Sequence, residues 1–182
     1  MEDYFYLAGT TLIEIPIHFI QSPVLPSVLS LSYTCLSCYD SRTLESVLQF
    51  LKDIFLTSSF SERIQSIPQT IVDPLCDMLK EKGCELMAKL FEGLVLTFPR
   101  DVVPYVGPLL VAMVKSMSNE TKAWLETVLG GLSEDEMGKQ EKETFLRKLW
   151  AYVYHIFSLS IFSFSLSFSF SFSLAISSHS IW

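Results

Sequence analysis

Cysteines are the residues of this chain best suited to redox or metal chemistry, because thiolates are nucleophiles and metal ligands. Cys35 and Cys38 form a Cys-x-x-Cys motif, and seven residues separate Cys76 from Cys84. A redox motif of the thioredoxin type follows a strand and opens a helix, whereas Cys35 and Cys38 lie at the end of an expected helix. The wider pair has poor spacing for zinc. We therefore expect all four cysteines to be small core residues.

Histidines and clustered carboxylates offer no stronger catalytic pattern. His18, His155 and His179 have neither a second histidine at helical spacing nor a nearby nucleophile motif. The acidic run at 134–136 is expected to be a solvated loop, and no glycine-rich phosphate loop occurs. The sequence therefore predicts no catalytic, cofactor-binding or metal-binding residues, and we expect no enzymatic activity.

The charge distribution divides the chain into two parts. All 13 Lys and Arg residues and all 20 Asp and Glu residues occur at or before Lys148, which gives this part a net charge of −7. An acidic surface disfavours nucleic acid as a primary ligand, because phosphate binding needs clustered Lys and Arg. Glu2 and Asp3 stand where a secretory signal would be basic, and the cysteines form no disulfide framework. We therefore expect a reducing, intracellular compartment.

Helical periodicity dominates residues 1–150. Its strongest example runs from Leu44 to Phe55, with one apolar face at a period of 3.6 and Ser41 as the expected N-cap. Asp73 and Pro74 are expected to start another helix, which Gly83 stops. No strand is expected, so the predicted fold class is all-α. The expected helices cover residues 3–14, 23–35, 41–56, 73–82, 85–98, 104–117, 118–129 and 140–150.

Three pairs of prolines indicate that helix pairs repeat along the chain. The second prolines of these pairs are 48 and then 34 residues apart, which straddles the roughly 40–47 residue period of HEAT and armadillo repeats. Proline is tolerated in the first turn of a helix, because those N–H groups have no intrahelical partner. We therefore expect each second proline to open the second, inner helix of a repeat, and we favour an α-solenoid over a compact helical bundle. The pairs are Pro23/Pro26, Pro68/Pro74 and Pro104/Pro108.

Residues 151–182 form a low-complexity hydrophobic tail. Phe or Leu alternates with Ser through most of residues 156–176, and three interpretations remain open. The period of two fits a strand with one apolar face. The uncharged stretch after Arg147 and Lys148 is long enough for a membrane anchor. The composition also fits translation of a pyrimidine-rich simple repeat, which would make the tail a read-through or gene-model artefact.

Several segments of residues 2–150 resemble one family of helical-repeat proteins. The segments are Glu2–Ala8, Ile20–Leu25, Leu48–Ile54, Lys122–Leu132 and Phe145–Leu149. Together they resemble the C-terminal HEAT repeats of the transportin-SR (transportin-3) branch of the importin-β superfamily of karyopherins. The likeness is a distributed pattern rather than a catalytic motif. It implies that residues 1–150 are a fragment of an α-solenoid, because a whole receptor of this family is several times longer.

The resemblance also implies a function, the transport of protein cargo into the nucleus. Receptors of this branch import arginine/serine-rich splicing factors, bind the Ran GTPase chiefly through N-terminal repeats, and bind phenylalanine-glycine nucleoporins between helices. It implies a protein that shuttles between nucleus and cytoplasm without binding nucleic acid directly. The chain lacks the Ran-binding repeats and the Arg-rich cargo-contacting helix, so no cargo-binding residue is assigned. The alternative is a helical protein that the hydrophobic tail anchors in a membrane.

Overall fold

The computed structural model describes residues 1–58, 67–131, 140, 144, 147 and 151. The chain divides into two compact units, Met1–Gly138 and Lys139–Trp182. The four described residues of the second unit are helical. The rest of the helix expected at 140–150, the acidic loop at 133–137 and the tail beyond residue 151 fall outside the described residues.

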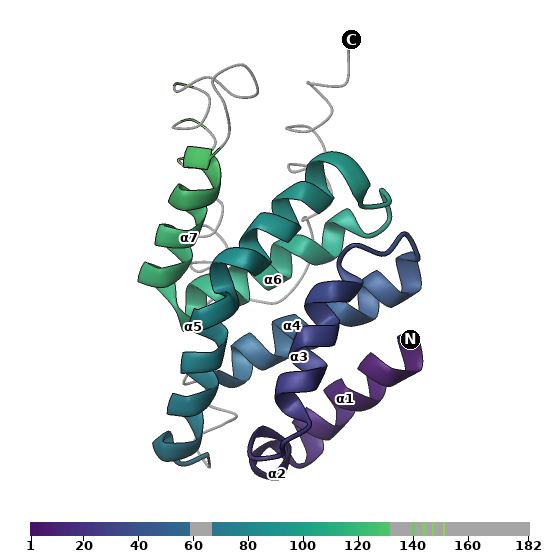
Figure 1. Ribbon diagram of the computed structural model, residues 1–182, viewed down its shortest axis with the longest axis vertical. Coiled ribbons are helices and arrows are strands. Elements are labelled where there is room, and N and C mark those ends of the chain that lie inside the picture. Colours follow the sequence, from purple (N-terminus) through teal and green to yellow (C-terminus); the bar gives the residue numbers. More distant parts are fainter. Residues whose placement is uncertain (59–66, 132–139, 141–143, 145–146, 148–150, 152–182) are drawn as a thin grey trace. The chain divides into compact units, whose positions relative to one another are not determined.

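The described part of the first unit is almost entirely helical and contains no strand (Figure 1). The all-α class predicted from the sequence is therefore confirmed for these residues. In chain order the helices are α1 (Glu2–Glu14), α2 (Pro16–Ile20), α3 (Leu25–Cys35), α4 (Ser41–Ser58), α5 (Gln69–Glu92), the π-helical turn η2 (Gly93–Thr97), α6 (Val103–Ser116) and α7 (Ser118–Gly131).

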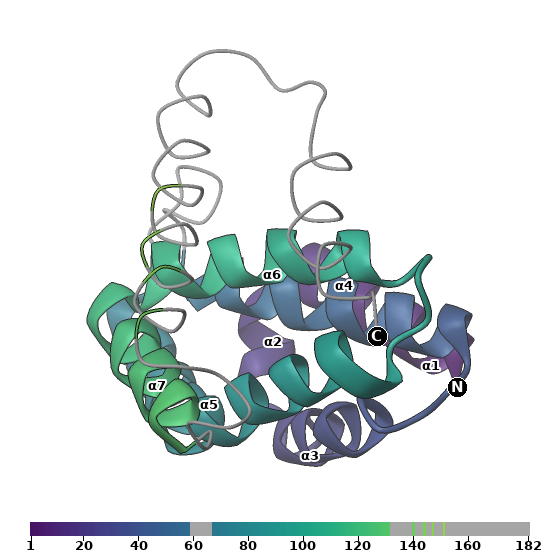
Figure 2. The ribbon, with the colours of Figure 1, turned by 90° about the horizontal axis from the view of Figure 1, so that it is seen from above.

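The long helices of the first unit form two layers. In one layer α4 contacts both α1 and α6, and in the other layer α5 contacts both α3 and α7. Figure 2 shows α4 and α6 along one side of the unit, with α3, α5 and α7 along the other. From α3 to α7 the chain changes layer at every step, so neighbours within a layer are two helices apart in sequence.

Helix α4 is buried on more than one of its faces. Phe50 is buried outside the apolar face that the sequence predicts. Its ring centroid lies 6.0 Å from that of Phe5 in α1 and 6.5 Å from that of Phe19 in α2. This burial on two faces follows from the contacts of α4 with α1, α3, α5 and α6. The apolar face predicted from the sequence is confirmed, because all its members are fully buried: Leu44, Val47, Leu48, Leu51, Ile54 and Phe55.

Asp40, rather than the expected Ser41, caps α4. The Asp40 Oδ2 atom accepts hydrogen bonds from the Thr43 backbone N–H at 2.9 Å and from the Thr43 hydroxyl at 2.6 Å. These bonds lower the pKa of the Asp40 carboxyl. The Ser41 hydroxyl instead donates to Asp101 Oδ1 at 3.2 Å, which ties the start of α4 to the turn before α6. Both residue types cap helices well, so the sequence placed the cap one residue too late.

Helix α5 is one helix of 24 residues where the sequence predicts two. Gly83, expected to stop the first of them, is buried inside α5. A β-carbon there would collide with the indole ring of Trp124 in α7. Glycine at this position therefore allows two helices to approach closely and does not end a helix.

The prolines do not mark one recurrent helix start. Pro26 and Pro104 lie in the first turns of α3 and α6, as expected. Pro74 and Pro108 instead lie inside α5 and α6, where each removes one hydrogen bond to a carbonyl one turn earlier. Both are exposed, so solvent can satisfy that carbonyl. Because α6 also lies in a different layer from α3 and α5, the prediction that all three pairs open the same helix of a repeat is wrong.

Candidate functional site

A half-open groove of about 370 Å³ lies between α3 and α5. Apolar side chains, among them Leu29 and Met78, form part of its wall. Serine and threonine side chains of α3 line one side, and charged side chains of α5 line the other. A groove of this size and mixed lining can hold one side chain or a short segment of a ligand.

Three of the four charged side chains of this groove make contacts with other side chains. Lys82 Nζ lies 3.3 Å from Glu85 Oε2, an exposed pair three residues apart on α5. Lys89 Nζ donates to the Ser37 hydroxyl at 3.4 Å, which connects α5 to the turn after α3. The side chain of Glu81, one turn before Glu85, has no partner among the described residues. The groove therefore combines two ammonium groups with two carboxylates and has no net charge.

Tyr33 lines the groove from α3 and carries a polar group without a partner. The side chain is 5% exposed, and its hydroxyl makes no hydrogen bond in the described structure. Burial, and secondarily the charge of Glu85, raise the pKa of Tyr33 far above its usual value. The phenol is thus neutral at physiological pH and keeps a proton to donate. No local sequence pattern predicts this unpartnered hydroxyl, because the groove joins residues about fifty positions apart.

The Cys-x-x-Cys motif lies at the end of α3, where the sequence places it. Cys35 is 3% exposed, and both Cys35 and Cys38 are free thiols. Burial and the neighbouring Cys38 raise the pKa of the Cys35 thiol, whereas reactive cysteines have a lowered pKa. Cys76 and Cys84 are partly exposed residues of α5, and burial raises the pKa of Cys76 as well. The prediction of four core cysteines holds for Cys35 and is too strong for the others.

The remaining candidate residues do not assemble into a site. His18 is exposed on α2, while His155 and His179 fall outside the described residues. In the part of the chain that the structure describes, no three His, Cys, Asp or Glu side chains gather closely enough to hold a metal ion.

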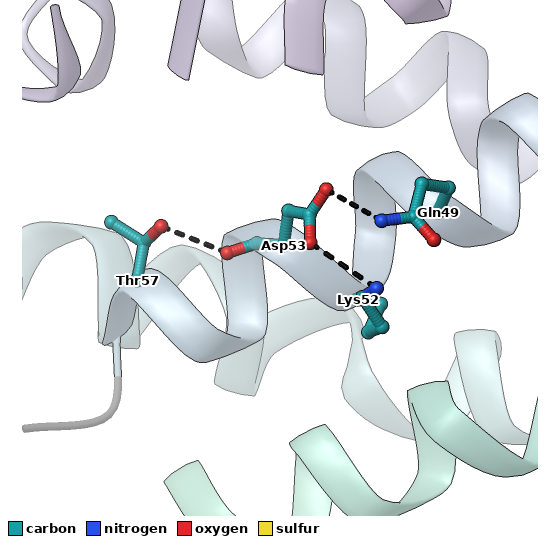
Figure 3. A network of polar contacts seen from close by, with 4 residues as sticks. All are labelled: Gln49, Lys52, Asp53 and Thr57. Carbon is teal, nitrogen blue, oxygen red and sulfur yellow. Dashed lines mark hydrogen bonds and ion pairs between the residues drawn. The ribbon is translucent and has the colours of Figure 1, made fainter. Parts of the chain in front are cut away.

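A polar network on α4 is an internal feature of that helix. Asp53 Oδ2 accepts a hydrogen bond from Gln49 Nε2 at 3.0 Å, and Asp53 Oδ1 lies 3.5 Å from Lys52 Nζ (Figure 3). The Thr57 hydroxyl donates to the backbone carbonyl of Asp53 at 2.8 Å. These contacts all lie within one helix, so the network stabilises α4.

The second candidate surface is the outward face of α1, defined by Tyr6, Leu7, Thr10, Thr11 and Ile13. Tyr6, Leu7 and Ile13 are 75%, 64% and 66% exposed. The Thr10 and Thr11 hydroxyls donate to backbone carbonyls one turn earlier, at 2.9 Å and 2.8 Å. These bonds satisfy both hydroxyls within the helix, so the face resembles a helix surface that packs against another helix.

The helix expected at residues 3–14 is α1, and its apolar residues lie on two faces. Phe5 and Leu12 are 1% exposed and pack inward, whereas Leu7 and Ile13 point outward. None of the helices in the described residues is both long and apolar enough to cross a membrane.

Comparison with known proteins shows a distant similarity to a longer yeast protein. The chain matches no known family model. It is similar to the uncharacterized protein C11G11.07 of Schizosaccharomyces pombe, with 27% identity over 158 residues. The match covers 80% of this chain and 16% of the yeast protein. The chain therefore spans only about one sixth of the length of this relative.

Proposed function

We propose that the chain is a HEAT-repeat fragment of a nuclear transport receptor of the importin-β superfamily, which binds protein cargo and has no enzymatic activity. The observation that carries the proposal is the alternation of α3 to α7 between two layers. In a solenoid each helix pair packs mainly on its neighbours, so first and second helices fall into separate layers. On this interpretation α3 with α4 and α5 with α6 are successive pairs, and α1 is the second helix of an earlier pair.

Two further observations support a piece of a longer array. The outward face of α1 is apolar and exposed, as expected where an adjacent repeat would pack. The yeast relative is several times longer than the part that matches this chain, and a receptor of the proposed family is longer by a similar factor.

The proposed cargo is the class of arginine/serine-rich splicing factors. The family resemblance supplies this class, and the net charge of −7 is complementary to basic segments. The Ran GTPase and phenylalanine-glycine nucleoporins are proposed partners of the full-length receptor, which would shuttle between nucleus and cytoplasm. We propose no direct contact with nucleic acid.

A pull-down tests this proposal. The immobilised 182-residue chain is incubated in parallel with an arginine/serine-rich domain and with Ran-GTP. We expect salt-sensitive retention of the domain and no retention of Ran-GTP, because the Ran-binding repeats of this family are N-terminal. The matched control is the same domain with every arginine replaced by alanine. Equal retention of the control, or strong binding of Ran-GTP, contradicts the proposal.

A further inference from the structure

The groove between α3 and α5 contains a donor that the folded chain does not use. The Tyr33 hydroxyl is buried and has no partner among the described residues. Buried polar groups are nearly always hydrogen-bonded, so an unpartnered hydroxyl at a groove points to a ligand that completes it. Because this phenol remains protonated at neutral pH, the ligand atom that it faces is expected to be an acceptor.

Acceptors lie on the opposite wall of the same groove. Glu81 and Glu85 are four residues apart on α5 and so lie on one face of that helix. Glu85 uses Oε2 for Lys82, which leaves Oε1 available, and the Glu81 side chain has no partner among the described residues. Tyr33 and Glu85 both line this groove, and the charge of Glu85 contributes to the raised pKa of Tyr33.

The charge balance disfavours strongly charged ligands. Lys82 and Lys89 offset Glu81 and Glu85, so neither an anion nor a cation gains a net attraction. The ligand that fits is therefore neutral and carries a donor and an acceptor side by side. A primary carboxamide has this arrangement, with one carbonyl acceptor and two N–H donors.

We propose that the groove between α3 and α5 binds the side-chain carboxamide of a glutamine or asparagine on a protein partner. Its carbonyl oxygen accepts from the Tyr33 hydroxyl, and its NH₂ group donates to Glu85 and Glu81. The methylene groups of the ligand pack against Leu29 and Met78. The inference rests on the proposed function only in that the partner is a protein, and it assigns a contact that the family resemblance does not supply.

Peptide titration monitored by NMR tests this inference. The ¹⁵N-labelled 182-residue chain is titrated with acetyl-Ala-Gln-Ala-N-methylamide, whose blocked C-terminus carries no primary carboxamide, and with the matching peptides that carry Glu or Met in place of Gln. We expect the Gln peptide to bind about tenfold more tightly than either, as one good hydrogen bond allows. Its shifts are expected at backbone amides of α3 and α5, and its affinity should change little with salt.

Substitution of the tyrosine separates recognition from stability. Tyr33→Phe removes only a hydroxyl without an internal partner, so the chain should remain folded while the preference for Gln over Met disappears. Tyr39→Phe is the matched control, because Tyr39 is 78% exposed in the turn before α4, and it should keep the full preference. Equal binding of the Gln and Met peptides, shifts confined to other helices, or an unchanged preference in Tyr33→Phe overturns the inference.

The peptide titration and the pull-down can each succeed or fail without the other. If the arginine/serine-rich domain is not retained while the Gln preference is found, the groove stands and the transport proposal falls. If the domain is retained and no peptide shows the preference, the carboxamide site falls and the transport proposal stands.

Discussion

At the scale of single residues, Gly83 controls the approach of α7 to α5. A methyl group at this position would occupy the space of the Trp124 ring. Overpacking costs about 1–3 kcal/mol, while alanine gains about 1 kcal/mol over glycine in a helix. Because the indole ring is rigid and buried, we expect Gly83→Ala to lower the free energy of unfolding by about 1–2 kcal/mol, as measured by urea unfolding.

Gly9 in α1 provides the matched control for Gly83. No side chain lies within 4 Å of a β-carbon built at Gly9, so only helix propensity should change there. Gly9→Ala should raise the free energy of unfolding by about 0.5–1 kcal/mol. A Trp124→Phe change should recover part of the stability lost in Gly83→Ala. Equal gains in both alanine variants would show that the indole ring does not restrict position 83.

Asp40 is expected to link stability to pH. Hydrogen bonds from Thr43 lower its pKa in the folded chain, whereas the unfolded value is about 3.9. The unfolded state therefore binds more protons in this range, so the contribution of the cap is complete above about pH 5 and is lost as pH falls toward the folded pKa. Asparagine caps helices without titrating. Urea unfolding between about pH 5 and pH 3 should show a larger loss for wild type than for Asp40→Asn, and parallel losses would count against the cap.

At the scale of helices, the sequence best predicts which residues are buried where a helix has a single buried stripe. The stripe of α4 could be read correctly because its apolar residues recur at a period of 3.6. The burial of Phe50, which lies outside that stripe, depends on α1 and α2, which no local pattern encodes. Gly83 and Pro74 were misread as helix boundaries for the same reason. Gly83 remains inside a helix because Trp124 packs against it. Pro74 remains inside a helix because it is exposed, so solvent can satisfy the carbonyl that loses its hydrogen bond.

Helix α4 should be the element most sensitive to truncation of its side chains. Leu48 is fully buried, so Leu48→Ala should lower the free energy of unfolding by about 2–5 kcal/mol through lost burial and a residual cavity. Leu7 on the outward face of α1 is 64% exposed, and Leu7→Ala should stay within about 0.5 kcal/mol of wild type. Thermal and urea unfolding of the two variants tests this contrast. A comparable loss for Leu7→Ala would mean that its side chain is packed in solution.

At the scale of the whole molecule, neither candidate surface could be found from the sequence. The groove requires α3 and α5 to lie together, and the unpartnered Tyr33 hydroxyl is visible only after burial is known. The outward face of α1 mixes Tyr, Leu, Ile and Thr, which reads as an ordinary helical stripe. Its exposure becomes informative only because the opposite side of α1 already packs on α4.

The outward face of α1 should decide how the isolated chain associates. Water is excluded when exposed apolar side chains pair, so this face favours self-association in the absence of another helix. We expect the double variant Leu7→Lys/Ile13→Lys to shift sedimentation velocity profiles toward smaller species without lowering the free energy of unfolding. Val95→Lys/Leu96→Lys is the matched control, because both side chains are 75% exposed near the end of η2, and it should shift the profile less.

The same substitutions distinguish an exposed surface from a covered one in a longer protein. If an adjacent repeat covers α1 there, Leu7→Lys/Ile13→Lys places two charges in an apolar contact between helices, and burying an unpaired charge is strongly unfavourable. The variant should then lower the melting temperature of the longer protein while leaving that of the 182-residue chain unchanged. Equal effects in both proteins would mean that nothing covers this face, and would remove the apolar surface of α1 as support for a longer solenoid.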